Sequence, residues 1–547
     1  MFPIVRWVLV TACCLVLPVA AGAQDAKPPA DNPALASAEH LRRSGQLAEA
    51  EASYRTLVKA DPNLVAAQTG LVASLLKQQK VDEALEAVKT ALETQPSSPP
   101  LLAARGDVQF RLADMEGAES SYSDAKMLDR KDIHAHLGLA RLYRSQSMYG
   151  KANVELLRAR DLAPNDPDVQ QAWFDLLPRR ERLAAMEAYL SGPHANNDEA
   201  TQRTADAVEF LKQTIDQPVH TCKLESKVEK TEAPLDLLKN ALGIRSGINL
   251  KVLISGRTVG LQLDTGASGI LLSRRMAERL GLKRISAAHF AGIGDHGPST
   301  GYMALADRIQ VGALDFRDCV VGVVDKFSDS SQDGLIGTDV FADYLVEVDV
   351  PGSRLALSPL PKRPTEPEAA TYLHSPGDER TAADQQEAGE TTTKSGAPAD
   401  RYIAADMSRW TQVFRFGHQL LVPTSVNDAE SKLFLLDTGA FDNILAERTG
   451  HQVGKVKNSF GPRITGLSGD VKKAFHTKVD LRVGHLQQSN LDITTLNLSD
   501  ISAKTGTEVS GLLGFVMLQM LDVKIDYRDG LVQMTFDPKR VQQLMKP

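Results

Sequence analysis

LQLDTGASGILLS (residues 261–273) and FLLDTGAFDNILA (residues 434–446) are two versions of one phrase within the same chain. In each, apolar residues lead into Asp-Thr-Gly-Ala, and a second apolar run follows. A single Asp-Thr-Gly carries little information, because it occurs by chance in roughly one chain in ten of this length. The question is whether the similarity extends beyond the phrase around Asp264 and Asp437.

The segments that flank Asp264 predict a β-rich unit. VLISGRTVGLQLDTGA (252–267) alternates apolar residues on both sides of a Ser-Gly turn, which predicts a hairpin that leads into Asp264. HFAGIGDHGPSTGYMALA (289–306) predicts a second hairpin with a glycine-rich tip. DGLIGTDVFADYLVEVDVPGSRLALSP (333–359) predicts an apolar run ending at Gly337, a short helix and two closing strands.

The segments that flank Asp437 follow the same order. VPTSVNDAESKLFLLDTGA (422–440) leads into Asp437, ITGLSGDVKKAFH (464–476) supplies the glycine-rich tip, and SGLLGFVMLQMLDVKIDYRDGLVQMTFDP (510–538) supplies the closing unit. The aspartate and the last glycine of the apolar run are 73 residues apart in the first copy (264 to 337) and 77 in the second (437 to 514). The sequence therefore contains a duplicated domain.

On these motifs the chain resembles the aspartic proteases, the pepsin-like and retropepsin-like enzymes, over residues 225–358 and 402–538. It is most similar to the retropepsin-like fold, present here in two copies that together form a pseudo-dimer. The resemblance implies that Asp264 and Asp437 form a catalytic dyad. Two neighbouring carboxyls share one proton, so one can draw a proton from water while the other donates to the peptide carbonyl.

The resemblance also implies roles for the neighbouring residues. Thr265 and Thr438 would hydrogen-bond across the lobe interface, and the glycines after them would let the backbone approach the carboxylates. Two glycine-rich tips match the flaps that close over a substrate, and they favour the symmetric retropepsin arrangement over the single pepsin flap. Tyr302 lies beyond the tip, so the pepsin flap tyrosine has no counterpart. The remaining predicted support and flap residues are Gly266, Gly439, Gly292, Ile293, Gly294, Gly466, Leu467 and Ser468.

A second repetition occupies the N-terminal part of the chain. Alanines recur every 34 residues at positions 50, 84, 118 and 152, and prolines at 62, 96 and 164 follow the same period. Apolar residues at helical spacing lie between the prolines. A small residue where two helices cross and a proline after the second helix resemble the tetratricopeptide repeat. Such an array implies either a concave surface for a peptide or partner protein, or a spacer or self-association module.

The first residues have the layout of a secretory signal. Arg6 precedes an apolar stretch that ends in Ala21-Gly22-Ala23, a typical cleavage site. An uncleaved membrane anchor is the alternative, and a lipoprotein cut before Cys13 fits less well because the apolar run continues past it. We therefore expect an exported, periplasmic or secreted protein with no membrane span in the mature chain.

Composition excludes several other functions. The formal net charge of −7 and the lack of a sustained Lys/Arg stripe argue against nucleic acid as a partner. No H-E-x-x-H or CxxC motif predicts a metal site, and nothing in the sequence predicts a cofactor. Cys13 and Cys14 leave with the signal. Cys222 and Cys319 remain, either as one disulfide or as two free buried cysteines.

The predicted architecture is multidomain, an all-α tetratricopeptide superhelix followed by an all-β bilobal acid-protease domain. The predicted segments are a signal peptide (1–23), helical repeats (35–178), a helical connector (179–218), lobe 1 (219–360), a disordered linker (361–400) and lobe 2 (401–547).

The predicted function is that of an exported aspartic endopeptidase acting on a peptide or protein substrate, with the repeats as a protein-interaction module. Two alternatives remain: the lobes only bind peptides as a catalytically silent scaffold, or each lobe pairs with the same lobe of a second chain.

Overall fold

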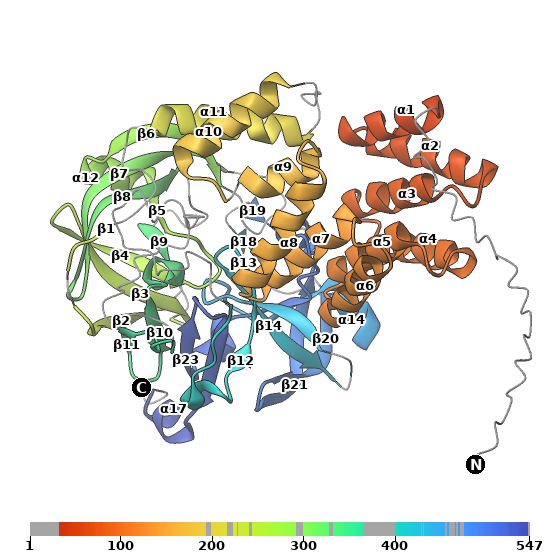
Figure 1. Cartoon of the computed structure of the whole chain (residues 1–547). Helices are drawn as coiled ribbons and strands as arrows, with labels where there is room; N and C mark the ends of the chain where they lie inside the picture. Colours follow the sequence, from red (N-terminus) through yellow and green to blue (C-terminus); the bar gives the residue numbers. More distant parts are fainter. Residues whose placement is uncertain are drawn as a thin grey trace, which may run out of the picture.

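The structure consists of an N-terminal run of helices followed by two β lobes, which confirms the predicted fold class (Figure 1). The computed structural model describes residues 32–544, apart from 175, 193–198, 216–222, 227, 240–242, 291–298, 326, 328–331, 365–399, 428, 430, 455–456, 459–464, 467–468 and 471–474. The predicted signal peptide and most of the predicted linker therefore lie outside the described residues.

The 34-residue period corresponds to antiparallel helix pairs. The four alanines at 50, 84, 118 and 152 are all buried where helices cross. A larger side chain there would push the helices apart. The helices of the array are α1 (Pro33–Arg43), α2 (Leu47–Ala60), α3 (Val65–Lys77), α4 (Val81–Thr94), α5 (Pro99–Arg111), α6 (Met115–Leu128), α7 (Ile133–Ser145) and α8 (Tyr149–Leu162).

Large and small residues interlock between successive repeats. The ring of Tyr54 on α2 packs against Gly70 on α3, and the ring of Tyr122 on α6 packs against Gly138 on α7. A Cβ atom at either glycine would overlap with the facing ring. Both tyrosines are buried, so each fills the space that the missing side chain leaves. This pairing fixes the spacing between neighbouring repeats.

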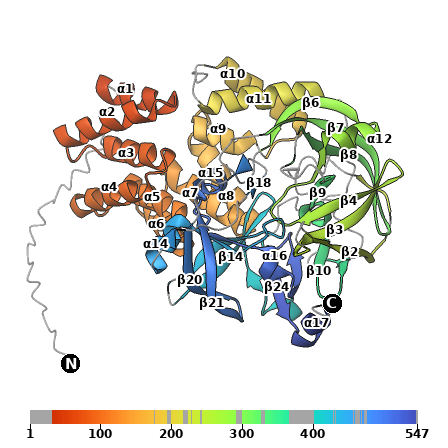
Figure 2. The same ribbon diagram turned by 180° about the vertical axis from the view of Figure 1, so that it is seen from behind.

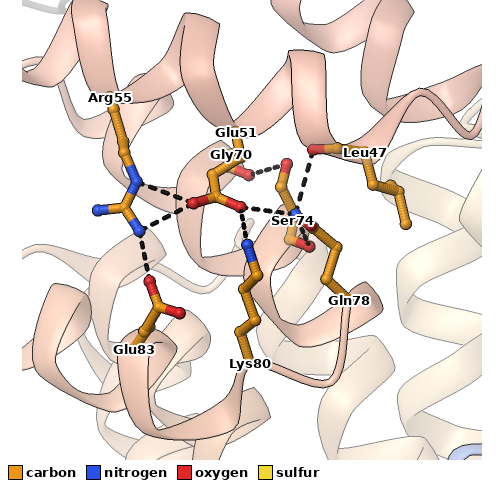
Figure 3. Close-up of polar contacts among 8 residues, drawn as sticks. All are labelled: Leu47, Glu51, Arg55, Gly70, Ser74, Gln78, Lys80 and Glu83. Carbon is orange, nitrogen blue, oxygen red and sulfur yellow. Dashed lines mark hydrogen bonds and ion pairs between the residues drawn. The ribbon is translucent and has the colours of Figure 1, made fainter.

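A buried carboxylate joins the first two repeats (Figure 3). Glu51 on α2 accepts hydrogen bonds from Arg55 Nε at 2.9 Å, Gln78 Nε2 at 2.9 Å and Lys80 Nζ at 2.7 Å. Arg55 also reaches Glu83 on α4, with Nη2 at 2.6 Å from Oε2. Burial alone would raise the pKa of Glu51, but these partners outweigh it and lower that pKa to about 2.

Three further helices leave the array and extend over lobe 1. They are α9 (Pro167–Phe174), α10 (Arg179–Ser191) and α11 (Glu199–Thr214). They share a small core of their own, which includes Phe174, Met186 and Val208. Both views show α10 and α11 beside the β6 end of lobe 1, and α11 contacts β6 (Lys283–Phe290) (Figures 1 and 2). This region therefore makes contact with the β domain as well as ending the array.

Lobe 1 forms as its sequence pattern predicts. β3 (Arg245–Ile254) and β4 (Arg257–Asp264) form a hairpin through Ser255 and Gly256, which both have positive φ. β4 runs parallel to β9 (Gly334–Gly337), so Leu263 lies opposite Ile336. The other elements of the lobe are β1 (Lys223–Leu224), β2 (Thr231–Lys239), β5 (Ile270–Ser273), α12 (Arg274–Leu280), β7 (Ser299–Val311), β8 (Leu314–Val324), η1 (Thr338–Phe341), β10 (Tyr344–Asp349) and β11 (Arg354–Pro359).

Lobe 2 repeats this topology. β14 (Gln419–Val426) pairs with β15 (Lys432–Leu436), and β15 runs parallel to β22 (Gly511–Leu513). The remaining elements are η2 (Ala405–Met407), β12 (Thr411–Gln412), β13 (Phe414–Phe416), β16 (Ile444–Ala446), α14 (Glu447–Val453), β17 (Lys457–Asn458), β18 (Thr465–Gly466), β19 (Gly469–Asp470), β20 (Phe475–Val483), β21 (Leu486–Leu496), α15 (Ser499–Thr505), α16 (Phe515–Leu518), β23 (Leu521–Asp526), β24 (Leu531–Phe536) and α17 (Pro538–Leu544).

The two lobes are joined by their closing strands. β10 of lobe 1 pairs antiparallel with β23 of lobe 2, with Val346 opposite Ile525 and Val348 opposite Val523. The sheet continues through β24 on one side and β11 and β2 on the other. Backbone hydrogen bonds and one shared apolar core therefore hold the lobes of a single chain together.

The helical array packs directly on lobe 2, which the sequence did not predict. The ring of Phe110 on α5 packs edge-on against the ring of Phe416 on β13, with 6.1 Å between the centroids. Thr507 Oγ1 donates to the carbonyl of Phe110 at 2.6 Å, and the amide of Glu508 donates to the carbonyl of Arg111 at 2.9 Å. One apolar core takes residues from both parts, among them Leu102, Phe110, Tyr122, Leu139, Leu421, Leu435, Leu496 and Leu512.

Both ends of the predicted linker are held at one turn of lobe 2. Arg363 forms an ion pair with Asp529, and the amide of Tyr402 donates to Asp529 Oδ1 at 2.8 Å. Arg401 Nε donates to the Asp529 carbonyl at 2.8 Å, and Arg528 Nη2 donates to the carbonyl of Pro361 at 2.7 Å. The chain therefore leaves and re-enters the β domain at the same place.

Two further observations concern the cysteines and the apolar character of the helices. Cys319 is buried and takes part in a disulfide, and the other cysteines of the chain lie outside the described residues. Within the part of the chain that the structure describes, we find no helix with both the length and the apolar character that a membrane crossing requires.

Candidate active site

The two aspartates meet at the interface between the lobes. Asp264 is the last residue of β4, and Asp437 directly follows β15. Each faces the glycine of the opposite copy: a Cβ atom at Gly439 would overlap with the Asp264 carboxylate, and one at Gly266 would lie 2.9 Å from Asp437 Cγ. Glycine is therefore required at both positions, because any side chain would separate the carboxylates.

Thr265 and Thr438 link the two loops reciprocally. The amide of Thr265 donates to Thr438 Oγ1 at 3.0 Å, and the amide of Thr438 donates to Thr265 Oγ1 at 2.9 Å. Each hydroxyl in turn donates to a carbonyl of the other lobe, to Leu436 at 2.8 Å and to Leu263 at 2.9 Å. Both threonines are buried, so these four hydrogen bonds act in a water-poor environment.

Backbone amides hold the carboxylates in place. The amide of Gly266 donates to Asp264 Oδ1 at 2.8 Å. The amides of Gly439 and Ala440 donate to Asp437 Oδ1 at 2.9 and 3.0 Å. These donors favour the ionised form of each carboxyl, whereas burial opposes it.

The electrostatics of the pair favour one shared proton. Burial is the main cause that raises the pKa of Asp264 well above its usual value, and the charge of Asp437 raises it further. Burial also raises the pKa of Asp437, but the amide of Ala440 and a hydrogen bond from Asp264 oppose this rise. Because the pKa rises more at Asp264 than at Asp437, the shared proton favours Asp264.

Each loop is supported by a different buried residue, and the sequence did not reveal either. In lobe 1, Asp339 accepts hydrogen bonds from the amide of Gly269 at 2.9 Å and from Ser268 Oγ at 3.0 Å. Burial raises the pKa of Asp339 to about 6. In lobe 2, Asn443 Oδ1 accepts from the amide of Gly514 at 2.9 Å. The signal available in the sequence was a polar residue next to an apolar one, Asp339 before Val340 and Asn443 before Ile444.

Two more residues near the dyad come from lobe 2 and contact lobe 1. His418 Nε2 lies 3.2 Å from the carbonyl oxygen of Gly266, and the hydroxyl of Tyr527 lies 2.5 Å from Thr338 Oγ1. Tyr527 is fully buried. Nothing in the local sequence around either residue indicates these contacts, because each depends on the pairing of the lobes.

The predicted flaps are described only in part. Gly292, Ile293 and Gly294 lie outside the described residues, although β6 and β7 pair up to Phe290 and Ser299 on either side of them. In lobe 2, Gly466 pairs with Gly469 in the small β18–β19 hairpin, and Leu467 and Ser468 lie outside the described residues. Paired strands therefore flank the predicted tip in lobe 1, and the Gly466–Gly469 pair flanks it in lobe 2.

Comparison with known families agrees with this geometry. Both lobes match the aspartyl protease family. The matched residues are 250–340 and 422–516, and each match contains one Asp-Thr-Gly-Ala loop with its apolar-apolar-Gly segment. The helical array matches the tetratricopeptide repeat over 35–99 and 69–133. The predicted resemblance to both families is therefore confirmed.

Two solved structures were also found to be similar. A thermophilic tetratricopeptide repeat protein of Thermus thermophilus is 20% identical, with a TM-score of 0.27 over 32% of this chain and 97% of that one. A retropepsin-like aspartic protease from Rickettsia conorii is 17% identical, with a TM-score of 0.18 over 25% of this chain and 96% of that one. The search of curated proteins found no match.

Proposed function

We propose that this chain is an aspartic endopeptidase whose dyad, Asp264 and Asp437, is completed within one chain. The observation that supports this most strongly is the reciprocal hydrogen bonding of Thr265 and Thr438 around two carboxyls that share a proton. A pair of loops that only bound peptides would have no need of two facing carboxyls in a buried site, where their mutual repulsion is costly.

The geometry suggests a role for each carboxyl. Asp437, ionised and held by two amides, takes a proton from the attacking water. Asp264, protonated, donates to the oxygen of the scissile carbonyl as the tetrahedral intermediate forms. Gly266 and Gly439 keep the two carboxyls close enough to exchange the shared proton.

The setting of the enzyme is part of the same proposal. The apolar N-terminal stretch supports export to the periplasm or beyond, and the disulfide at Cys319 is compatible with an oxidising compartment. The repeats supply a protein-interaction surface. The core of helices α1–α4 includes Ala104 and Val108 of α5 but no described residue of lobe 2, and Asp82 on α4 forms an ion pair with Arg448 of lobe 2. Helices α1–α3 are therefore the part proposed to bind a partner.

A digest of a denatured protein mixture tests the activity. The mature chain is incubated from about pH 3 to pH 7, and new peptide termini are identified by mass spectrometry. We expect cleavages that disappear in Asp264→Asn and in Asp437→Asn. Asp236→Asn is the matched control, because Asp236 is a half-exposed surface residue paired with Lys251. Cleavage that persists in both dyad variants would refute the proposal.

The same variants distinguish the alternatives. If each lobe paired with a second chain, mixing Asp264→Asn with Asp437→Asn would restore activity, whereas an intrachain dyad restores little. Absence of cleavage at every pH, combined with peptide binding that survives in both variants, would identify a catalytically silent scaffold.

A further inference from the structure

His418 lies at the turn between β13 and β14 of lobe 2, and its imidazole points toward the Asp264 loop of lobe 1. The preceding Gly417 has a φ of 62°, which lets the chain reverse tightly and directs the imidazole across the lobe interface. The ring nitrogen Nε2 lies 3.2 Å from the carbonyl oxygen of Gly266. Since a carbonyl can only accept, Nε2 must carry the hydrogen.

The carbonyl that His418 contacts belongs to a peptide group that also faces the dyad. The peptide that joins Gly266 to Ala267 carries the Gly266 oxygen at one end and the Ala267 amide at the other. The Ala267 amide donates to the main-chain carbonyl of Asp264 at 3.4 Å, which closes the turn in which the Gly266 amide donates to Asp264 Oδ1 at 2.8 Å. Because a peptide group is planar and trans, fixing the direction of the oxygen also fixes the direction of the N–H.

The hairpin that carries His418 is itself held from two sides. Arg415 Nη1 donates to the Tyr527 carbonyl at 2.9 Å and approaches the hydroxyl of Tyr149, on α8, at 3.4 Å. Phe416 packs on Phe110 of α5. The β13–β14 hairpin thus contacts the helical array, the rest of lobe 2 and the Asp264 loop of lobe 1.

The lowered pKa of His418 favours the neutral imidazole. Burial lowers the pKa of His418, and the nearby charge of Arg415 lowers it further, while the hydrogen bond to Gly266 opposes both. The imidazole therefore donates to Gly266 without adding a positive charge beside the dyad.

We propose that His418 is a positioning residue for the dyad: through the Gly266 carbonyl it orients the Gly266–Ala267 peptide, and with it the turn that directs the Gly266 amide at the Asp264 carboxylate. The β13–β14 hairpin, clamped between the helical array and lobe 2, holds the imidazole in place. This inference deepens the proposed peptidase function and rests on it for its kinetic test.

The kinetic test compares two polar replacements of different reach. His418→Gln can place an amide N–H where Nε2 lies, whereas His418→Asn is too short to reach the Gly266 carbonyl. We expect His418→Asn to lower kcat about tenfold with little change in KM, and His418→Gln to recover most of the loss. His485→Asn is the matched control, because His485 follows a positive-φ glycine in a similar Gly-His turn of lobe 2 but is exposed. Equal kcat in all four proteins, or an effect on KM alone, would overturn the proposal.

A second readout does not depend on peptidase activity. The dyad is titrated by NMR in protein labelled with ¹³C at the aspartate carboxyls, with Asp264→Asn to assign the signals. A weakened hydrogen bond from the Gly266 amide to Asp264 Oδ1 should move the upper apparent pKa of the dyad further upward in His418→Asn and leave it unchanged in His418→Gln and His485→Asn. An unchanged titration in His418→Asn would refute the positioning role even if no substrate is found. A shifted titration in a chain that cleaves nothing would refute the proposed function and leave the positioning role standing.

Discussion

Thr265 and Thr438 each donate a backbone amide to the other's hydroxyl, at 3.0 and 2.9 Å, across the boundary between two lobes of one chain. Each hydroxyl also donates onward to a carbonyl of the opposite lobe, Leu436 or Leu263. Both loops are therefore fixed by the same four hydrogen bonds, and neither can keep its geometry alone. The duplication is thus a structural requirement of the site.

Removal of one hydroxyl should weaken both loops. In Thr438→Val the Leu263 carbonyl and the Thr265 amide lose their buried partners, so we expect a loss of about 2–4 kcal/mol in the free energy of unfolding and a large fall in kcat. Thr438→Ser keeps the hydroxyl and is the control, with a much smaller effect. Denaturant unfolding and steady-state kinetics measure the two. Equal stability of the two variants would contradict the role of the hydroxyl.

A single methyl group at Gly439 should abolish activity without unfolding the lobe. The Cβ of Gly439→Ala would occupy the position of the Asp264 carboxylate, so the dyad must separate. Gly247→Ala is a suitable control, because the atom nearest to its Cβ would be the movable amide nitrogen of Gln262, at 3.1 Å, and Leu238 would be in ordinary contact at 3.6 Å. We expect cleavage to be lost in Gly439→Ala alone, with circular dichroism spectra that match the wild type. Wild-type activity in Gly439→Ala would exclude the dyad geometry.

Neutralisation of Asp264 should stabilise the fold at neutral pH. A carboxyl whose folded pKa is raised contributes stability that is fully present below its unfolded pKa and is lost as the pH rises through the folded pKa. Asp264→Asn removes this loss, so its melting temperature should exceed that of the wild type at pH 7 and approach it at about pH 3. Thermal unfolding at a series of pH values measures the difference. A less stable variant at pH 7 would show that the pair is not strained.

The Glu51 cluster predicts an opposite pH dependence in the array. Its folded pKa is lowered to about 2, so its contribution to stability is present above the unfolded pKa and is lost as the pH falls through the folded value. Glu51→Gln should therefore be less stable than the wild type at pH 7, with a gap that narrows from about pH 4 downward. Glu86→Gln on the exposed face of α4 is the control and should change little. A gap that is constant with pH would contradict this account.

The linker should be dispensable for the pairing of the lobes. Because Arg363 and Tyr402 both contact Asp529, the two ends of the segment lie at one turn. Replacement of residues 366–398 by about eight Gly and Ser residues should leave a monomer with wild-type kcat. Light scattering and the digest assay measure both properties. Dimer formation or loss of activity would show that the segment contributes to the paired state.

Much of the fold could be predicted from the sequence because its signals are local and repeated. The Ser255-Gly256 turn, the apolar run that ends at Gly337 and the 34-residue alanine period each depend on residues close together in the chain. Their recurrence in a second copy, or in four repeats, separated them from chance. The placement of Asp264 and Asp437 followed from the duplication and a known chemistry.

The contacts between the lobes, and between lobe 2 and the helical array, could not be predicted from such local patterns. The contacts of His418 with Gly266, of Tyr527 with Thr338 and of Thr507 with Phe110 join segments that are far apart in the chain. Two of the three end on a backbone carbonyl, a group that every residue carries, so no residue type marks the partner. The support of the loops by Asp339 in one lobe and Asn443 in the other also broke the internal symmetry that the sequence suggested.

The sequence by itself determined that there are two equivalent lobes, an array of helix pairs and one aspartate in each lobe, because periodic burial and turn chemistry act over short stretches of chain. Only the tertiary structure decided that the array shares a core with lobe 2, that both linker ends meet at Asp529, and that a histidine of one lobe contacts the Asp264 loop of the other. These arrangements depend on which surfaces come together once the elements have formed, and shape and charge complementarity between distant segments settle that.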